Sequence, residues 1–160
     1  MNIRGVTYFA IDVSMDEKGS LIFIPLSRSA DNGLGIMQKE TLLLHKPYTG
    51  KTVGKIARDF MQKSIDVPVI TDSLKVEDMP VKVKSWRKFD YDWYKVSVGL
   101  DKGIGYEIKP WRREKGKSWG HPDDPRYKLS LDVDDEKLGN TILEAFLYID
   151  RNFGFDKDKK

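Results

Sequence analysis

The sequence predicts an α+β fold, an antiparallel sheet with two principal helices packed mainly on one face. One pattern occurs twice, at residues 41–57 and 128–142: leucines alternate, and apolar residues then recur with helical spacing. The remaining apolar segments alternate with a period of two and are separated by turn residues. At 160 residues the chain can bury about 70% of its unfolded surface as one domain, residues 1–160.

The first predicted element is a β-hairpin. Residues 6–13 and 20–26 alternate as strands, and residues 16–19 form a turn in which Gly19 can adopt a positive φ. Pro25 cannot donate a hydrogen bond to a sheet, so we expect it at a strand end or an edge.

A loop over residues 28–35 and a strand over residues 36–45 follow. The first helix is then expected from Thr49 to Ser64. Its apolar side consists of Val53, Ile56, Ala57, Phe60 and Met61. Residues 66–80 receive no firm element because proline interrupts both ends of the segment.

The second half begins with a predicted meander of strands over residues 81–85, 93–100 and 105–109, and residues 101–103 turn the second strand into the third. Residues 115–125 contain several glycine and proline breakers, so we expect an exposed loop there.

The last predicted elements are a strand at residues 128–131 and a helix capped by Asp134. Both helices carry an early glycine, Gly54 and Gly139, which we attribute to close approach of the helix to the sheet. The charged tail, residues 155–160, is expected to fray.

Composition narrows the function. Lys plus Arg number 28 and Asp plus Glu 25, a formal net charge of +3, which is far from a nucleic-acid-binding polycation and from an acidic mimic of nucleic acid. The chain has no cysteine, which suits a reducing compartment. No apolar stretch resembles a signal peptide or a membrane span, so we expect a cytoplasmic protein without a membrane partner.

Catalytic and metal-binding patterns are weak. The histidines, His45 and His121, would need carboxylates such as Asp123 and Asp124 to hold a metal, and their spacing does not indicate a site. A serine-hydrolase elbow and a phosphate loop are also missing. We therefore expect a protein that is not an enzyme and needs no cofactor or small-molecule ligand.

A metal-dependent nuclease is the one enzyme class that the residues suggest, through Asp92 and the later Glu107-Ile-Lys109. The predicted hairpin, however, puts Glu107 opposite residues 97–99. Asp92 would then lie roughly 16 to 23 Å away along its strand, too far to share an ion.

Residues 86–126 hold all four tryptophans, interleaved with arginine and lysine. Such residues are enriched at protein-binding hot spots. They also suit single-stranded nucleic acid, where bases stack on rings. A third interpretation places Trp93 and Trp86 in the core, with the charges facing water.

Three segments, residues 19–26, 28–35 and 134–146, resemble the immunity proteins of bacterial contact-dependent growth inhibition systems. The resemblance implies a cytoplasmic protein that binds and neutralises the C-terminal toxin domain of a cognate effector, and a nuclease is the implied toxin. Some members of this family accept a toxin β-hairpin into their sheet. Backbone hydrogen bonds supply affinity in such strand addition.

We select Trp111, Arg112, Arg113 and Trp119 as toxin-binding residues, because they follow the predicted hairpin and enter a broken loop, where we expect side chains to be exposed yet held by a rigid sheet. The alternative function is a module that binds protein or single-stranded nucleic acid through residues 86–126. Nucleic acid is the less favoured partner.

Overall fold

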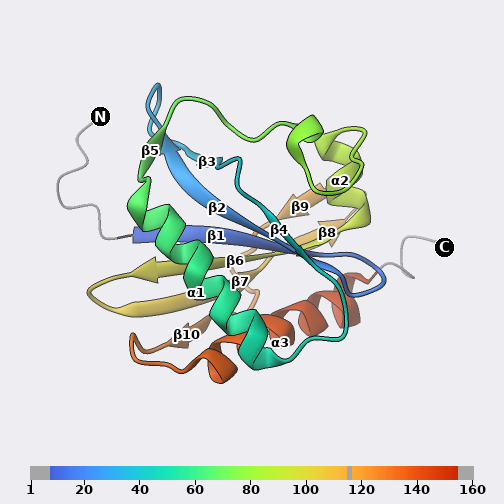
Figure 1. Cartoon of the computed structure of the whole chain (residues 1–160). Helices are drawn as coiled ribbons and strands as arrows, with labels where there is room; N and C mark the ends of the chain where they lie inside the picture. The colour runs from blue at the N-terminus through green and yellow to red at the C-terminus, as the bar shows by residue number, and fades with distance from the viewer. Residues whose placement is uncertain (1–7, 115–116, 155–160) are drawn as a thin grey trace.

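Eight strands form the main sheet in the computed structural model, which describes residues 8–114 and 117–154 (Figure 1). The sheet runs in the order β10-β7-β6-β1-β2-β3, and β4 and β5 also pair with β2. All pairs are antiparallel except β2 with β5. These strands are β1 (Tyr8–Met15), β2 (Leu21–Ser29), β3 (Gly35–Met37), β4 (Leu42–Leu44), β5 (Val69–Ile70), β6 (Tyr94–Asp101), β7 (Gly105–Pro110) and β10 (Tyr127–Leu129).

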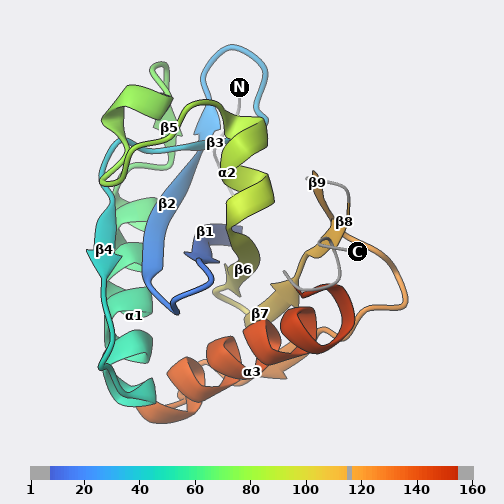
Figure 2. The same cartoon turned by 90° about the vertical axis from the view of Figure 1, so that its right-hand side faces the viewer.

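The predicted α+β class is therefore confirmed, with α1 (Gly50–Asp66) and α3 (Asp135–Phe153) packed together against one face of the sheet (Figures 1 and 2). Their N-caps are Thr49 and Asp134, each of which accepts a hydrogen bond from a backbone N–H in the first turn. Asp134 was the predicted cap. The charged tail, predicted to fray, lies outside the described residues.

The early glycines do permit a close approach, but to the other helix rather than to the sheet. A Cβ atom on Gly54 would overlap the carbonyl oxygen of Asp135 and lie 2.9 Å from the Gly139 nitrogen. One on Gly139 would overlap the carbonyl oxygen of Gly50. The predicted contact partner was wrong, because helical spacing indicates that one face is crowded without indicating by what.

The first hairpin is confirmed, with Gly19 at φ 85° in its turn. Pro25 lies in the middle of β2 rather than at an end or an edge. On one side of β2, Pro25 is the last residue that pairs with β1, where it lies opposite Ile11. On the other side, β2 pairs with β4 up to Phe23 and with β3 from Leu26 onward. The proline thus occupies a position where the pairing of β2 changes.

Strand β2 is buried on both faces. Leu21 and Phe23 face the main core under α1 and α3, whereas Ile22 and Ile24 face a second apolar cluster on the opposite side of the sheet. Helix α2 (Trp86–Asp92) supplies part of this second cluster and lies across the sheet from α1 (Figure 2). The sequence patterns did not predict α2.

Several other segments differ from the predictions. Residues 81–85 form no strand; Val81 and Val83 pack against the second cluster instead. The strand expected over residues 36–45 is two short strands, β3 and β4. The unassigned residues 66–80 contain β5 and a 3-10 turn, Val76–Asp78. The predicted 115–125 loop begins with part of a hairpin, β8 (Arg112–Glu114) with β9 (Lys117–Trp119).

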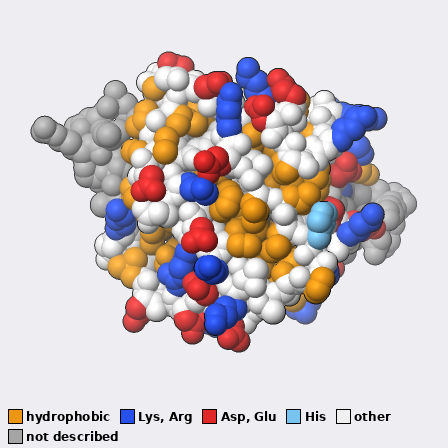
Figure 3. Space-filling view, viewed as in Figure 1, with side chains coloured by type: hydrophobic (Ala, Val, Ile, Leu, Met, Phe, Trp, Pro, Cys, Tyr) orange, Lys and Arg blue, Asp and Glu red, His pale blue; other side chains and the backbone are white. Residues whose placement is uncertain are grey.

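On the face seen in Figure 3, acidic and basic side chains are interspersed, with apolar side chains exposed between them. Such a surface has no single dominant sign of charge. Within the described residues, no helix combines the length and apolarity needed to cross a membrane.

Candidate binding cavity

The sheet splits between β1 and β2 at one end. Pairing of β1 with β2 stops at Ile11 opposite Pro25, yet β1 continues to pair with β6 as far as Tyr8 opposite Asp101. Beyond Pro25, β2 pairs with β5 from Arg28 onward. The two central strands therefore diverge, and β5 takes the place beside β2 that β1 leaves.

Ser64, near the end of α1, occupies the point where the strands separate. Its hydroxyl donates to the carbonyl oxygen of Leu26 on β2 at 2.5 Å, and the Ala10 N–H on β1 donates to the same hydroxyl at 3.4 Å. The side chain is buried and satisfies two backbone groups that β-pairing would otherwise join. Ser64 thus bridges the diverging strands.

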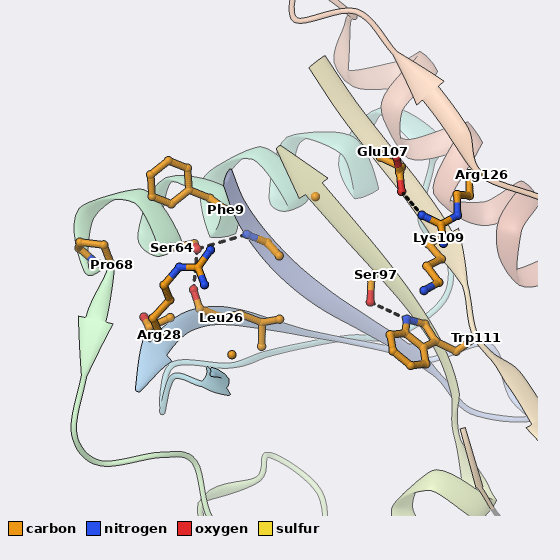
Figure 4. Close-up of a pocket in the computed structure, with 14 residues that line it drawn as sticks. Phe9, Leu26, Arg28, Ser64, Pro68, Ser97, Glu107, Lys109, Trp111 and Arg126 are labelled. Atoms are coloured by element: carbon orange, nitrogen blue, oxygen red, sulfur yellow. Dashed lines mark hydrogen bonds and ion pairs between the residues drawn. The ribbon is translucent and has the colours of Figure 1, made fainter. Parts of the chain in front are cut away.

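A cavity of about 360 Å³ lies over this split and across the adjoining face of β6 and β7 (Figure 4). Ala10 and Gly99 are opposite one another on β1 and β6, so the sheet surface here carries little side-chain volume. Phe9 and Trp111 provide aromatic walls. Its volume and mixed lining are typical of a ligand-binding or side-chain-binding pocket.

The polar groups next to this surface form a connected chain. The Trp111 indole N–H donates to the Ser97 hydroxyl at 2.6 Å, and that hydroxyl donates to an Asp12 carboxylate oxygen at 3.2 Å. Burial raises the pKa of Asp12, while the neighbouring Lys95 and the Ser97 hydrogen bond oppose the increase. Lys95 and Lys109 each place an ammonium over the Trp111 ring, at 4.5 and 4.7 Å from its centre.

These contacts hold Trp111 in one orientation, which favours a recognition role. A nucleophilic serine requires an adjacent general base that removes its proton. The Ser97 hydroxyl accepts from the Trp111 indole N–H and donates to the buried Asp12 carboxylate, so both of these hydrogen bonds serve to position Trp111. The arrangement is suited to binding.

The four residues predicted to bind a toxin do not form one surface. Trp111 lines the cavity. Arg113 is buried, its guanidinium donates to the Tyr91 carbonyl oxygen, and it lies over the Tyr91 ring, so the expectation that it is exposed was wrong. Trp119 is 36% exposed and contacts His121.

Arg112 faces α3 rather than solvent. Its Nε donates to both oxygens of Asp124, at 3.0 and 2.9 Å, and its guanidinium lies over Trp119 and Phe153. Asp124 also accepts from the Tyr148 hydroxyl at 2.6 Å, so it joins the β8–β9 hairpin to α3. Arg112 and Arg113 point in opposite directions because they are consecutive residues of a strand.

Two of the four tryptophans are structural. Trp93 is buried in the second apolar cluster, where it stacks on Phe89 at 5.4 Å, and Trp86 packs against the edge of that cluster. The core interpretation is thus confirmed for Trp93, whereas Trp86 is partly buried at the edge of the same cluster.

The histidines serve local contacts. His45 shares a hydrogen bond with the Ser20 hydroxyl, and the His121 ring accepts one from the Asp123 backbone N–H. In the two described ranges, no three side chains of the types His, Cys, Asp and Glu come together as a potential metal site.

Sequence reasoning missed most of the cavity. Ser64 was predicted only as a helix end, Arg28 as part of a loop and Glu107 as a rejected metal ligand. These residues come from α1, β2 and β7, and no local spacing links them. The sequence signal that could have marked the place is Pro25, where the pairing of β2 changes.

The fold and the cavity define a class: an α+β domain whose central sheet opens beside a ligand-sized cavity. A solved structure with a similar fold is described as a protein of unknown function, NMB0488, from Neisseria meningitidis. The two chains align with a TM-score of 0.66 and 17% sequence identity, over 92% of this chain and 99% of that one. At this identity the likeness shows a shared fold alone. No protein-family model and no curated protein matches the chain.

Proposed function

We propose that this chain is a cytoplasmic immunity protein that binds and neutralises the C-terminal toxin domain of a cognate contact-dependent growth inhibition effector. The toxin we propose is a nuclease. The resemblance of residues 19–26, 28–35 and 134–146 to this family is the starting point. The observation that carries the proposal is the split between β1 and β2.

A split sheet suits recognition of a β-hairpin. An added strand gains affinity from backbone hydrogen bonds and specificity from pockets for alternate side chains. Here the diverging strands lie beside a cavity with aromatic walls, Phe9 and Trp111, and a floor of small residues. These features support entry of a toxin segment at this end of the sheet.

The nucleic-acid alternative receives less support. Base stacking requires accessible aromatic faces. Trp93 is in the core, Trp86 packs at its edge, and lysine ammoniums cover Trp111. Trp119 remains the tryptophan with an exposed ring in the described part of the chain.

The proposal is tested by co-expression with the C-terminal domain of a contact-dependent growth inhibition effector whose reading frame neighbours that of this chain. We expect the chain to rescue growth against that domain and to give no protection against unrelated toxin domains. If the wild-type chain folds in these cells and gives no rescue, the proposed function is wrong.

A matched pair of variants tests the cavity. A Cβ atom on Gly35, which lines the cavity, meets nothing within 4 Å, so we expect Gly35→Trp to fold and to obstruct the cavity. Gly103→Trp is the control, because Gly103 lies in the β6–β7 turn and its nearest neighbour is a side-chain oxygen at 3.6 Å. We expect Gly35→Trp to lose rescue and Gly103→Trp to keep it.

A further inference from the structure

We propose that the cavity is built for an extended peptide segment with acidic side chains, so the partner's inserted strand carries Asp or Glu at the positions that face the cavity. This inference rests on the proposed function for the identity of the partner. It adds the chemistry of the segment that is recognised.

The charges around the cavity are unbalanced. Three cations line it, Arg28 from β2, Lys109 from β7 and Arg126 just before β10, against one lining carboxylate, Glu107. Three positive charges minus one negative charge leave +2, whereas the formal net charge of the entire chain is +3. Positive charge is therefore concentrated at this site, and it complements a negative partner.

The carboxylate is already occupied. Glu107 on β7 accepts from a guanidinium nitrogen of Arg126, just before β10, at 3.2 Å (Figure 4). Arg28 and Lys109 form no ion pair within the described residues. Arg28 makes a long hydrogen bond of 3.4 Å to the Gly33 carbonyl oxygen, and Lys109 lies over the Trp111 ring. Both can bind an incoming carboxylate without losing a charged partner.

The arrangement of rows across the sheet explains why a strand fits better than a compact anion. Ala10, Gly99 and Glu107 form one cross-strand row, and Asp12, Ser97 and Lys109 form the next. The first row has small residues over β1 and β6, where the backbone of a peptide can approach closely. Arg28 stands across the split from this row (Figure 4). A strand has side chains on alternate positions, so one can reach Arg28 and another Lys109.

The test is a titration of the ¹⁵N-labelled full chain with synthetic peptides, followed by NMR. One blocked peptide alternates valine and glutamate, and its matched partner has lysine in place of every glutamate. We expect the glutamate peptide to shift the signals of Ala10, Arg28 and the Trp111 indole N–H, and the lysine peptide to leave them unchanged. Binding should weaken as salt is raised.

Reversing the charge of Lys109 tests whether the glutamate peptide binds at the cavity. Lys109→Glu should weaken binding of the glutamate peptide about tenfold, since it replaces an attraction by a repulsion. Lys82→Glu makes the same change in net charge at an exposed position that does not line the cavity, and we expect it to have no more than a small effect. If the reversal unfolds the chain, Lys109→Met takes its place, because it removes the ammonium without adding a negative charge, and we expect it to weaken binding of the glutamate peptide as well.

The proposal is overturned if the glutamate peptide shifts no cavity signals at millimolar concentration, if both peptides bind equally, or if a single-stranded oligonucleotide displaces the peptide from these residues. The co-expression assay distinguishes failure of the acidic-segment inference from failure of the proposed function. Rescue by the wild type that survives unchanged in Lys109→Glu contradicts the acidic-segment inference alone, whereas failure of the wild type contradicts the proposed function.

Discussion

At the scale of single residues, Asp124 is the clearest case of a side chain whose role depends on its neighbours. Its side chain is 1% exposed and holds Arg112 and the Tyr148 hydroxyl together. Burial by itself would raise the pKa of Asp124, but hydrogen bonds from Arg112 and Tyr148 outweigh it, and the pKa is lowered from its usual value. The pKa of Tyr148 is raised to about 12, chiefly by the hydrogen bond to Asp124.

These two shifts predict how stability depends on pH. Because folding lowers the Asp124 pKa, its contribution is present above pH 3.8 and is lost as the pH falls through the folded value. Because folding raises the Tyr148 pKa, its contribution is present below pH 10 and is lost as the pH rises towards about 12.

Tyr148→Phe should therefore lower the free energy of unfolding at pH 7 by about 1 to 2 kcal/mol and flatten its decline above pH 10. Urea unfolding of both proteins from pH 3 to 11 measures this. Tyr127→Phe is the control for the loss of stability at pH 7, since the structure gives Tyr127 no hydrogen bond to Asp124. Parallel wild-type and Tyr148→Phe curves above pH 10 would contradict the assignment.

At the scale of elements, the crossing of α1 and α3 is the contact that fixes how the helices lie on the sheet. Gly54 and Gly139 face each other across it, and the nearest atoms to a new Cβ are backbone atoms, which cannot move aside as a flexible side chain can. The two helices therefore act as one packed layer.

Gly54→Ala tests this crossing. In an isolated helix, alanine would stabilise by about 1 kcal/mol relative to glycine. Here we expect destabilisation by about 1 to 3 kcal/mol, because the methyl group overlaps α3. The sign of the change is thus the readout, measured by chemical denaturation. Gly35→Ala, where the added Cβ meets nothing within 4 Å, should leave stability nearly unchanged. A stabilised Gly54→Ala variant would show that the helices do not touch there.

At the scale of the whole molecule, the fold gives different elements and different partners to the residues that resemble a nuclease site in the sequence. Glu107 pairs with Gly99 in the sheet, whereas Asp92 is the last residue of α2 and its carboxylate binds Lys88. Glu107 itself binds Arg126. We therefore expect purified protein to cleave neither DNA nor RNA with added Mg²⁺ or Mn²⁺.

A fluorescent nuclease assay measures that expectation, with Glu107→Ala as the matched variant. Metal-dependent cleavage by the wild type that disappears in Glu107→Ala would overturn it. Cleavage that persists in the variant would indicate a contaminating enzyme.

Elements whose signals are local could be predicted from the sequence. Alternation of apolar and polar residues predicted the β1–β2 and β6–β7 hairpins. Helical spacing of apolar residues after the Asp134 cap predicted α3. The prediction of a strand was wrong for residues 81–85, whose alternating valines pack on the second apolar cluster without pairing in a sheet. Helix α2 was not predicted, and it is only seven residues long. Short elements depend on tertiary contacts more than on propensity.

The position of the cavity could not be predicted from local sequence signals. Its floor requires the β1–β6 register, its opening requires β5 to replace β1 beside β2, and its closure requires Ser64 on α1. Of the residues predicted to contact a toxin, Arg113 is buried and Trp111 lines the cavity. Periodicity specifies which face of an element is apolar, but the partner of that face is set by contacts between residues far apart in the chain.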